Sequence, residues 1–367
     1  MSVRATPFHA RAAEANGGNS WIARNGFTLA REYCGAREEA LAARMGAVMA
    51  DISWRWRVML EGPRTAEFLS RLTTRDAGVL EPGHAHKALW LTDAGGYRGA
   101  GVIARYGRDS YLLAAAACDA AWIGDAAQRF DVSLRDVSES EGGLGIIGPA
   151  ATALIADVGL DATLEPLAFR KMFWRGLDVV ISRWGEHGGF EVWCAADDGV
   201  VVWDRLMKVG QSFGLLPAGS DATDILDMEA GVARPSRDYE AASDGLAAEP
   251  SPKMLRLERL IEDDHLHFNG RAAYRAAQPK QRLVGIALDS ETPFADTILY
   301  RDGATVGRML TSLYSPALRR AIGFGRIDAS AAVPGTKLSV MPAPDANAIW
   351  AHVTDLPFLA APAPIGA

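Results

Sequence analysis

One segment of the chain carries the residue types that suit binding of a flat heterocycle. It reads Arg183-Trp184-Gly185-Glu186-His187-Gly188-Gly189-Phe190-Glu191, and we expect it to end one strand, turn over the glycines and begin another strand. A carboxylate such as Glu191 can accept two hydrogen bonds from an N–C–N edge, and an aromatic ring such as Trp184 can stack on the heterocycle. An ordinary hairpin with an exposed Glu191 has the same pattern, and from the pattern alone this second interpretation is favoured.

A second glycine-rich motif resembles a dinucleotide-binding fingerprint. Residues 143–148 read Gly-Leu-Gly-Ile-Ile-Gly, but the fingerprint requires a strand before the first glycine and a helix that opens on the glycines. Here Ser138-Glu139-Ser140-Glu141 precedes the motif, and the apolar strand is expected within it, from Leu144 to Ile147. We therefore predict a plain strand entry at this position.

Two histidine pairs are the remaining candidates for metal ligands. His84 and His86, and likewise His265 and His267, are two residues apart, so each pair would share one face of a strand. No carboxylate or cysteine is spaced nearby as an obvious third ligand. The sequence therefore predicts no metal site.

A short internal repeat predicts the elements that position these residues. Apolar strands end at Gly62-Pro63 and again at Gly148-Pro149, and each is followed by a helical pattern. Proline fits the first turn of a helix, and glycine permits the tight turn before it. Two strand–Gly-Pro–helix units predict two related α+β lobes, and the first of their helices, expected from Pro63 to Leu72, should bury Phe68, Leu69 and Leu72.

The two ends of the chain have different patterns. Residues 1–20 are polar and read as an arm. Beyond Arg282, five strands are predicted before residue 342, which is typical of an all-β module of the barrel or sandwich type. They are expected at Leu283–Leu288, Thr297–Tyr300, Gly307–Ser312, Ala321–Ile327 and Lys337–Met341.

Composition excludes several classes of protein. The chain has 367 residues, 49% hydrophobic and 23% charged, with a net charge of −7, which fits a globular protein of two or three domains and argues against a nucleic-acid or anionic-membrane partner. It contains no apolar run of about 18 residues. Its three cysteines, Cys34, Cys118 and Cys194, read as buried thiols in a reducing compartment, so we expect a cytoplasmic protein.

Several short stretches recur in the order known from one enzyme family. Together they resemble the aminomethyltransferase family of the glycine-cleavage T-protein, and the ends of the chain resemble its tetrahydrofolate-dependent demethylase branch, which acts on dimethylsulfoniopropionate or aromatic ethers. The stretches are residues 60–63, 72–76, 80–85, 92–96, 184–191, 226–231, 269–273 and 311–316, and the ends are residues 5–8 and 353–358.

The resemblance implies an α+β fold of three domains in a cloverleaf around a channel that holds tetrahydrofolate, with a C-terminal β-barrel or jelly-roll-like domain. The expected division is 1–52 with 141–245 for the first, folate-binding domain, 53–140 for the second and 246–367 for the third. Glu191 falls at the pterin-binding glutamate of the family and Trp184 at an aromatic residue beside the pterin. Gly96, in the Gly-Gly turn, is placed with them as a cofactor-binding residue.

The chain departs from the family pattern at one instructive position. The T-protein carries an acid shortly after the Gly-Gly turn, whereas this chain reads Gly95-Gly96-Tyr97-Arg98-Gly99-Ala100. Glycine cleavage is therefore not expected. Arg98 could stabilise a phenolate leaving group or bind a ring carboxylate, and Tyr97 and Tyr239 could donate hydrogen bonds or a proton. A salt bridge for Arg98 and core packing for the tyrosines are the alternatives.

These observations predict an enzyme, a tetrahydrofolate-dependent O-demethylase that moves a methyl group from a methoxylated aromatic acid to N5 of tetrahydrofolate. Arg98, Tyr97 and Tyr239 are its predicted catalytic residues, and its partners are the small-molecule donor and tetrahydrofolate. The first alternative is a sulfonium or methylamine donor, which would need an aromatic cage and a carboxylate. The second is a non-catalytic folate-binding accessory protein, whose relatives carry a cysteine motif that is missing here.

Overall fold

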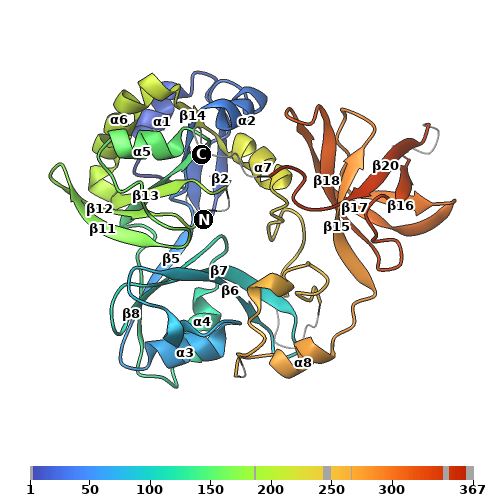
Figure 1. The fold of residues 1–367 in the computed structure, drawn as a ribbon, viewed down its shortest axis with the longest axis horizontal. Helices are drawn as coiled ribbons and strands as arrows, with labels where there is room; N and C mark the ends of the chain where they lie inside the picture. The colour runs from blue at the N-terminus through green and yellow to red at the C-terminus, as the bar shows by residue number, and fades with distance from the viewer. Residues whose placement is uncertain (1–2, 186, 243–248, 266, 342–346, 361–367) are drawn as a thin grey trace.

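A computed structural model of the chain describes residues 3–185, 187–242, 249–265, 267–341 and 347–360. These residues form three lobes arranged around a central space (Figure 1). Two lobes are built on mixed sheet and helix, and the third is a closed six-stranded barrel. The predicted α+β class and the C-terminal barrel are confirmed.

The first lobe is built on a six-stranded sheet whose strand order is β11-β12-β13-β10-β4-β14. Its strands β4 and β10 are neighbours, although the whole second lobe lies between them in the sequence, so the chain leaves this sheet and returns to it. The strands are β4 (Val48–Asp51), β10 (Glu141–Ile147), β11 (Phe169–Trp174), β12 (Leu177–Ser182), β13 (Phe190–Ala195) and β14 (Leu216–Ala218). Its helices are α2 (Ala36–Met45), α5 (Ala151–Asp157), α6 (Gly199–Gly210) and α7 (Ser220–Glu229).

The N-terminal segment is not an arm, and that prediction was wrong. Phe8 is fully buried and packs on Trp203, with 6.2 Å between the ring centroids. The polar composition of residues 1–20 concealed this apolar anchor, which ties the segment to α6 of the first lobe. The segment forms β1 (Arg4–Ala5), α1 (His9–Ala15), β2 (Trp21–Arg24) and β3 (Phe27–Ala30), and these strands make a small sheet in the order β1-β3-β2.

The second lobe is a five-stranded sheet in the order β6-β7-β8-β5-β9. The helix predicted after Gly62-Pro63 is confirmed as α3 (Thr65–Leu72), which buries Phe68, Leu69 and Leu72 as expected. A second helix, α4 (Ala120–Ala127), packs Ile123 and Ala127 into the same core. The strands are β5 (Trp56–Glu61), β6 (Ala85–Leu91), β7 (Tyr97–Arg105), β8 (Ser110–Ala115) and β9 (Ser133–Asp136).

The third lobe is a closed barrel with the strand order β15-β18-β17-β16-β19-β20. Each of the five predicted strands overlaps one of its strands, and the sixth strand, which the sequence analysis missed, pairs with both β15 and β19 and closes the barrel. The strands are β15 (Gln281–Leu288), β16 (Thr297–Arg301), β17 (Ala304–Ser315), β18 (Arg320–Asp328), β19 (Lys337–Val340) and β20 (Ile349–Thr354), and the helix α8 (Arg271–Ala276) precedes them.

Buried polar contacts attach the barrel to the first lobe. Glu229, at the end of α7, is fully buried, forms an ion pair with Arg44 of α2 and accepts a hydrogen bond of 2.5 Å from the Ser315 hydroxyl of β17.

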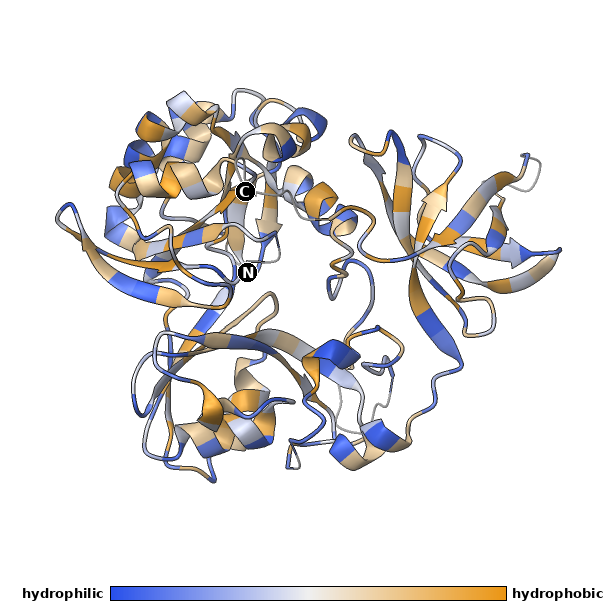
Figure 2. Cartoon of the chain, in the orientation of Figure 1, coloured by the Kyte–Doolittle hydropathy of each residue, from blue (hydrophilic) through white to orange (hydrophobic). Residues whose placement is uncertain are grey.

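In Figure 2 the apolar segments lie mostly within the lobes, on their strands and on parts of the helices. We propose the domain division given above, whose boundary at residues 245 and 246 lies outside the described residues.

The exposure of the cysteines and the length of the helices bear on two expectations from composition. Cys194 is buried as predicted, but Cys34 and Cys118 are exposed, so the prediction of three buried thiols was wrong for two of them. No helix in the described ranges is long and apolar enough to cross a bilayer.

The two Gly-Pro turns depend on glycine for a steric reason. Gly62 and Gly148 have φ values of +145° and +129°, which side chains with a Cβ atom rarely adopt. A Cβ atom on Gly148 would also stand 2.7 Å from the carbonyl oxygen of Ala43, at the end of α2. The turn therefore permits the close approach of α2 to the strand-to-helix junction.

Replacement of Gly148 should destabilise the protein in two ways, through backbone strain at its positive φ and through the clash with the Ala43 carbonyl oxygen. We predict that Gly148→Ala lowers the free energy of unfolding by about 3 kcal/mol, from backbone strain and overpacking together. Gly176→Ala is the matched control, because Gly176 has φ +91° but no atom within 4 Å of its Cβ position. Chemical denaturation followed by circular dichroism measures both; equal losses in the two variants would show that the contact with α2 contributes nothing.

Candidate functional site

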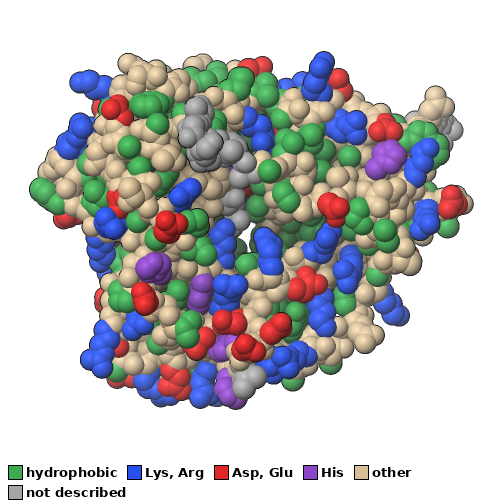
Figure 3. Space-filling view, viewed as in Figure 1, with side chains coloured by type: hydrophobic (Ala, Val, Ile, Leu, Met, Phe, Trp, Pro, Cys, Tyr) green, Lys and Arg blue, Asp and Glu red, His purple; other side chains and the backbone are tan. Residues whose placement is uncertain are grey.

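A cavity of about 910 Å³ lies where the three lobes meet. Figure 3 shows the molecule hollowed at this junction. The wall contributed by the first lobe includes Trp184, Glu191 and Trp193, and the second lobe contributes β6, β7 and residues 114–119. Further lining residues are Leu283 of the barrel, Leu356 and Pro357, and residues 230–236, 239–242, 255–257, 259 and 260.

Glu191 is a buried carboxylate in the cavity wall. It lies on β13 and is 3% exposed, and the two-residue period of the strand places it on the same face as Trp193. Its Oε2 accepts hydrogen bonds from the indole nitrogens of Trp184 (2.6 Å) and Trp193 (3.1 Å). Its Oε1 forms an ion pair with Arg55. The interpretation as an exposed hairpin residue is therefore wrong.

The contacts of Glu191 keep it ionised despite its burial. Burial by itself would raise the pKa of the carboxyl group, but Arg55 and the two indole donors outweigh that effect and hold the pKa below its ordinary value. A buried, ionised acceptor in a cavity wall fits a ligand with adjacent N–H donors, such as the N–C–N edge of a pterin.

Trp184 lies beside Glu191, as the sequence predicted, but its contacts in the described structure differ from simple stacking on a ligand. The indole donates to Glu191, and the ring packs against Phe169 with 5.5 Å between centroids.

The glycine-rich motif at residues 143–148 has a packing role. Gly143 on β10 pairs with Trp193 on β13, and a Cβ there would stand 2.6 Å from the indole ring. The predicted plain strand is confirmed as part of β10.

Arg98 lies on β7 and lines the same cavity. Its guanidinium group donates to both oxygens of Asp119, at 2.6 and 2.8 Å, and lies over the ring of Trp122 at 4.7 Å. Asp119 also accepts a hydrogen bond of 3.0 Å from the Trp90 indole. The structure therefore contains the salt bridge that was the alternative for Arg98, and it places that salt bridge in the cavity wall.

Asp119 is a cavity residue that the sequence analysis missed. It follows an alanine-rich stretch and Cys118, and no motif marks it. Only the end of β8 and the start of α4 bring it beside Arg98.

Tyr97 and Tyr239 meet in the cavity wall. Their rings form an edge-on contact with 5.3 Å between centroids, and their hydroxyl groups share a hydrogen bond. Burial raises the pKa of Tyr97 to about 12 and that of Tyr239 well above 10. Both phenols are therefore protonated at neutral pH and can donate hydrogen bonds. Gly96 forms the turn before Tyr97 and is not among the described residues that line the cavity, so its role in cofactor binding stays a prediction.

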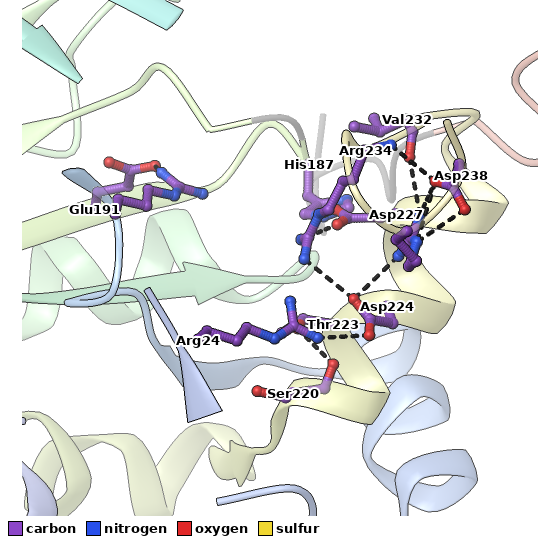
Figure 4. A network of polar contacts seen from close by, with 12 residues as sticks. Arg24, His187, Glu191, Ser220, Thr223, Asp224, Asp227, Val232, Arg234 and Asp238 are labelled. Atoms are coloured by element: carbon purple, nitrogen blue, oxygen red, sulfur yellow. Dashed lines mark hydrogen bonds and ion pairs between the residues drawn. The ribbon is translucent and has the colours of Figure 1, made fainter. Parts of the chain in front are cut away.

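A network of arginines and aspartates supports the cavity next to α7 (Figure 4). Arg234 forms ion pairs with Asp227 and with Asp224, and His187 contacts Asp227 at 2.8 Å. Burial, together with the guanidinium groups of neighbouring arginines, lowers the pKa of Arg234 to about 9, which leaves it charged at neutral pH.

The histidine pairs do not form a metal centre in the described part of the chain, where no group of three His, Cys, Asp or Glu side chains could hold an ion. Burial and the nearby charge of Arg75 lower the pKa of His86 to about 4, so this imidazole is neutral. His265 contacts the backbone oxygen of Ser70 at 2.6 Å. The absence of a metal requirement stays a prediction.

Comparison with known proteins decides the family. The GCVT N-terminal domain model matches residues 8–249, and the glycine cleavage T-protein C-terminal barrel domain model matches residues 281–359. The chain belongs to the glycine-cleavage T-protein family. The resemblance noted from the sequence is thereby confirmed, and with it an enzyme of folate-dependent one-carbon transfer.

Individual relatives agree with this assignment. The aminomethyltransferase of Geobacillus kaustophilus is 30% identical over 330 residues, which cover 86% of this chain and 88% of that protein. The aminomethyltransferase of Bacillus subtilis is 28% identical over 336 residues, covering 88% and 91%. The crystal structure of aminomethyltransferase T from Bartonella henselae superposes with a TM-score of 0.87 at 23% identity, covering 98% of this chain and 99% of that one, which shows the shared fold.

The cavity of this family member fits tetrahydrofolate by its donor and acceptor chemistry. Glu191 would hold the pterin edge, and Trp184 and Trp193 would orient that carboxylate. We predict that Glu191→Ala weakens tetrahydrofolate binding by about 2–4 kcal/mol, the usual cost of removing one partner of a buried charged hydrogen bond. Titration calorimetry on the folded variant measures this change, and unchanged affinity would contradict the assignment of Glu191 to the pterin.

The pH dependence of binding should report the ionisation of Glu191. Since its pKa is lowered in the folded protein, affinity should persist into acid and fall only as pH drops through that lowered value. Arg55→Ala removes the compensating cation, so burial dominates and the midpoint should move to higher pH. Arg108→Ala, at an exposed position outside the cavity, is the control and should leave the midpoint in place.

Proposed function

We propose that this family member is a tetrahydrofolate-dependent O-demethylase of methoxylated aromatic acids. The observation that carries the proposal is the environment of the Gly-Gly turn. A Cβ on Gly99 would stand 2.5 Å from the indole nitrogen of Trp90, so no acidic side chain fits there, and the adjacent Arg98 instead places a guanidinium group in the cavity wall. This arrangement supports a reaction that expels an anion.

Demethylation of an aryl ether breaks the bond between methyl and ether oxygen and forms a bond between methyl and nitrogen. Tetrahydrofolate supplies that nitrogen, N5, and the proton it loses balances the protonation of the phenolate. The ether oxygen therefore gains negative charge as the methyl group leaves. Hydrogen-bond donors held in place before the reaction stabilise such charge best, because they need no reorganisation.

The residues of the cavity wall would supply those donors. Asp119 and the ring of Trp122 fix the plane of the Arg98 guanidinium group. Tyr97 and Tyr239, with their raised pKa values, keep their protons at neutral pH and can donate to the phenolate oxygen. In this proposal Arg98 and the tyrosines act on the leaving oxygen or on a ring carboxylate, and Glu191 acts on the pterin.

A second candidate function has one observation in its favour. Asp119 is a carboxylate in the cavity wall, and Trp90 and Trp122 lie against the Arg98–Asp119 pair. Aromatic rings around a carboxylate also suit a sulfonium or quaternary ammonium donor such as dimethylsulfoniopropionate. The pairing with Arg98 opposes it, because the Asp119 carboxylate is already compensated and offers no net negative charge to a cationic methyl donor.

A panel of methyl donors separates the two candidates. The protein, tetrahydrofolate and one donor are incubated anaerobically with EDTA, and 5-methyltetrahydrofolate is measured by mass spectrometry. We expect product with a methoxybenzoate or a halogenated analogue. Product with dimethylsulfoniopropionate or a methylamine alone would establish the second candidate, and activity that requires a divalent metal would contradict the prediction of no metal site.

Substitution of Arg98 tests its part in the reaction. Since Lys cannot reproduce the bidentate geometry of a guanidinium group, we predict that Arg98→Lys loses much of the turnover and Arg98→Ala nearly all of it. The loss should be smaller for a substrate whose phenol is more acidic, because that leaving group needs less stabilisation. Folate affinity, measured separately, should change little. Wild-type turnover of Arg98→Ala on every aryl ether would show that the residue has a structural role.

A further inference from the structure

Arg57 is a buried cation that the reaction described above does not use. It lies on β5 of the second lobe, is 1% exposed and stands outside the set of described residues that line the cavity. Its Nε donates to Glu141, on β10 of the first lobe, at 2.7 Å, while its Nη1 is buried and has no hydrogen-bond partner in the described part of the chain. A buried charge with an unmet hydrogen bond is costly, so a contribution to stability alone accounts poorly for this residue.

The guanidinium group of Arg57 lies over the ring of Trp193, with 3.7 Å between its central carbon and the ring centroid. Trp193 is 2% exposed and belongs to the cavity wall. On β10, Gly143 leaves the space that this ring fills, since a Cβ atom there would stand 2.6 Å from the ring. Arg57 and Gly143 together therefore leave the indole little freedom to rotate.

A cation over an indole ring also changes that ring as a hydrogen-bond donor. The cation attracts the π electrons, which leaves the indole N–H more positive, and polar contacts linked in this way strengthen one another in a buried site. The Trp193 N–H donates to Oε2 of Glu191 at 3.1 Å. Arg57 can therefore act on Glu191 through Trp193.

We propose that Arg57 is a positioning residue for the folate site: it fixes the plane of the Trp193 indole and strengthens the hydrogen bond that aims Glu191 at the pterin. The inference rests on the folate part of the proposed function and not on the identity of the methyl donor. Arg55, two residues earlier, forms an ion pair with the other oxygen of Glu191. Two arginines at the start of the second lobe would thus hold both oxygens of a carboxylate in the first lobe.

A double-mutant cycle tests whether Arg57 acts through Trp193. Tetrahydrofolate affinity is measured by titration calorimetry, without donor, for the wild type, Arg57→Gln, Trp193→Phe and the double variant. Phenylalanine has no N–H to aim or to strengthen, so in that background the loss of Arg57 should weaken binding less than about twofold, whereas in the wild type it should weaken binding roughly five- to tenfold. Equal losses in the two backgrounds would overturn the proposal.

Two further variants control for charge and for folding. Arg135→Gln, at an exposed position of the neighbouring strand β9, removes the same charge and should keep the wild-type affinity. Arg57→Lys keeps a cation but not the planar group, so it should recover part of the affinity lost in Arg57→Gln, and it carries the same cycle if Arg57→Gln does not fold. Loss of affinity in Arg135→Gln, or an Arg57→Lys variant no better than a folded Arg57→Gln, would contradict the proposal.

The pH profile of binding is a readout that a loss of stability alone does not move. The charged and titratable groups at this contact are Arg55 beside Glu191, and Glu141 and Tyr106 beside Arg57. Burial raises the pKa of Tyr106, so this phenol stays protonated in the acid range. With a weaker donor at Glu191, the midpoint for loss of binding should move to higher pH in Arg57→Gln. A larger shift in Glu141→Gln would assign the midpoint to Glu141 and overturn the proposal.

Failure of this inference and failure of the proposed function give different results. Unchanged affinity in Glu191→Ala would refute the pterin site and, with it, the role of Arg57. Failure of every aryl ether as donor would refute the proposed reaction and leave the cycle as measured, because the cycle contains no donor.

Discussion

Three arginines converge on Asp224, and much of the molecule depends on this cluster of paired charges. Arg24 comes from the small N-terminal sheet, and Arg234 and Arg237 come from the segment after α7. Removing one member of a buried ion pair leaves an uncompensated charge, which is far more costly than losing a surface contact. The cluster therefore holds the N-terminal segment, α7 and the cavity wall in one arrangement.

The same network connects the barrel to the site. Asp238 accepts hydrogen bonds from Arg237 and, at 2.6 Å, from the Thr311 hydroxyl of β17. Tyr239 follows directly in the sequence and lines the cavity. The position of a predicted catalytic residue is thus coupled to the docking of the barrel, although the barrel contributes few cavity residues of its own.

Charge pairing also explains how one cavity can contain both an ionised hydrogen-bond acceptor and neutral hydrogen-bond donors. Glu191 is ionised because Arg55 and two indole donors outweigh its burial, whereas the tyrosines are neutral at neutral pH at their ordinary pKa of about 10, which burial raises further. Glu191 therefore accepts hydrogen bonds while Tyr97 and Tyr239 donate them. An acceptor suited to a pterin and donors suited to a developing oxyanion can in this way line the same cavity without neutralising one another.

Local patterns in the sequence were enough to predict the strand–Gly-Pro–helix units, α3 and five strands of the barrel, because strand and helix periods and the conformational freedom of glycine are properties of neighbouring residues. Motif order was enough to predict the family. Only the tertiary structure decided what Glu191 touches, that Phe8 anchors the N-terminal segment, and that Asp119 neutralises Arg98. Those contacts join residues far apart in the chain, and their energy depends on burial and on the partner, neither of which a local pattern contains.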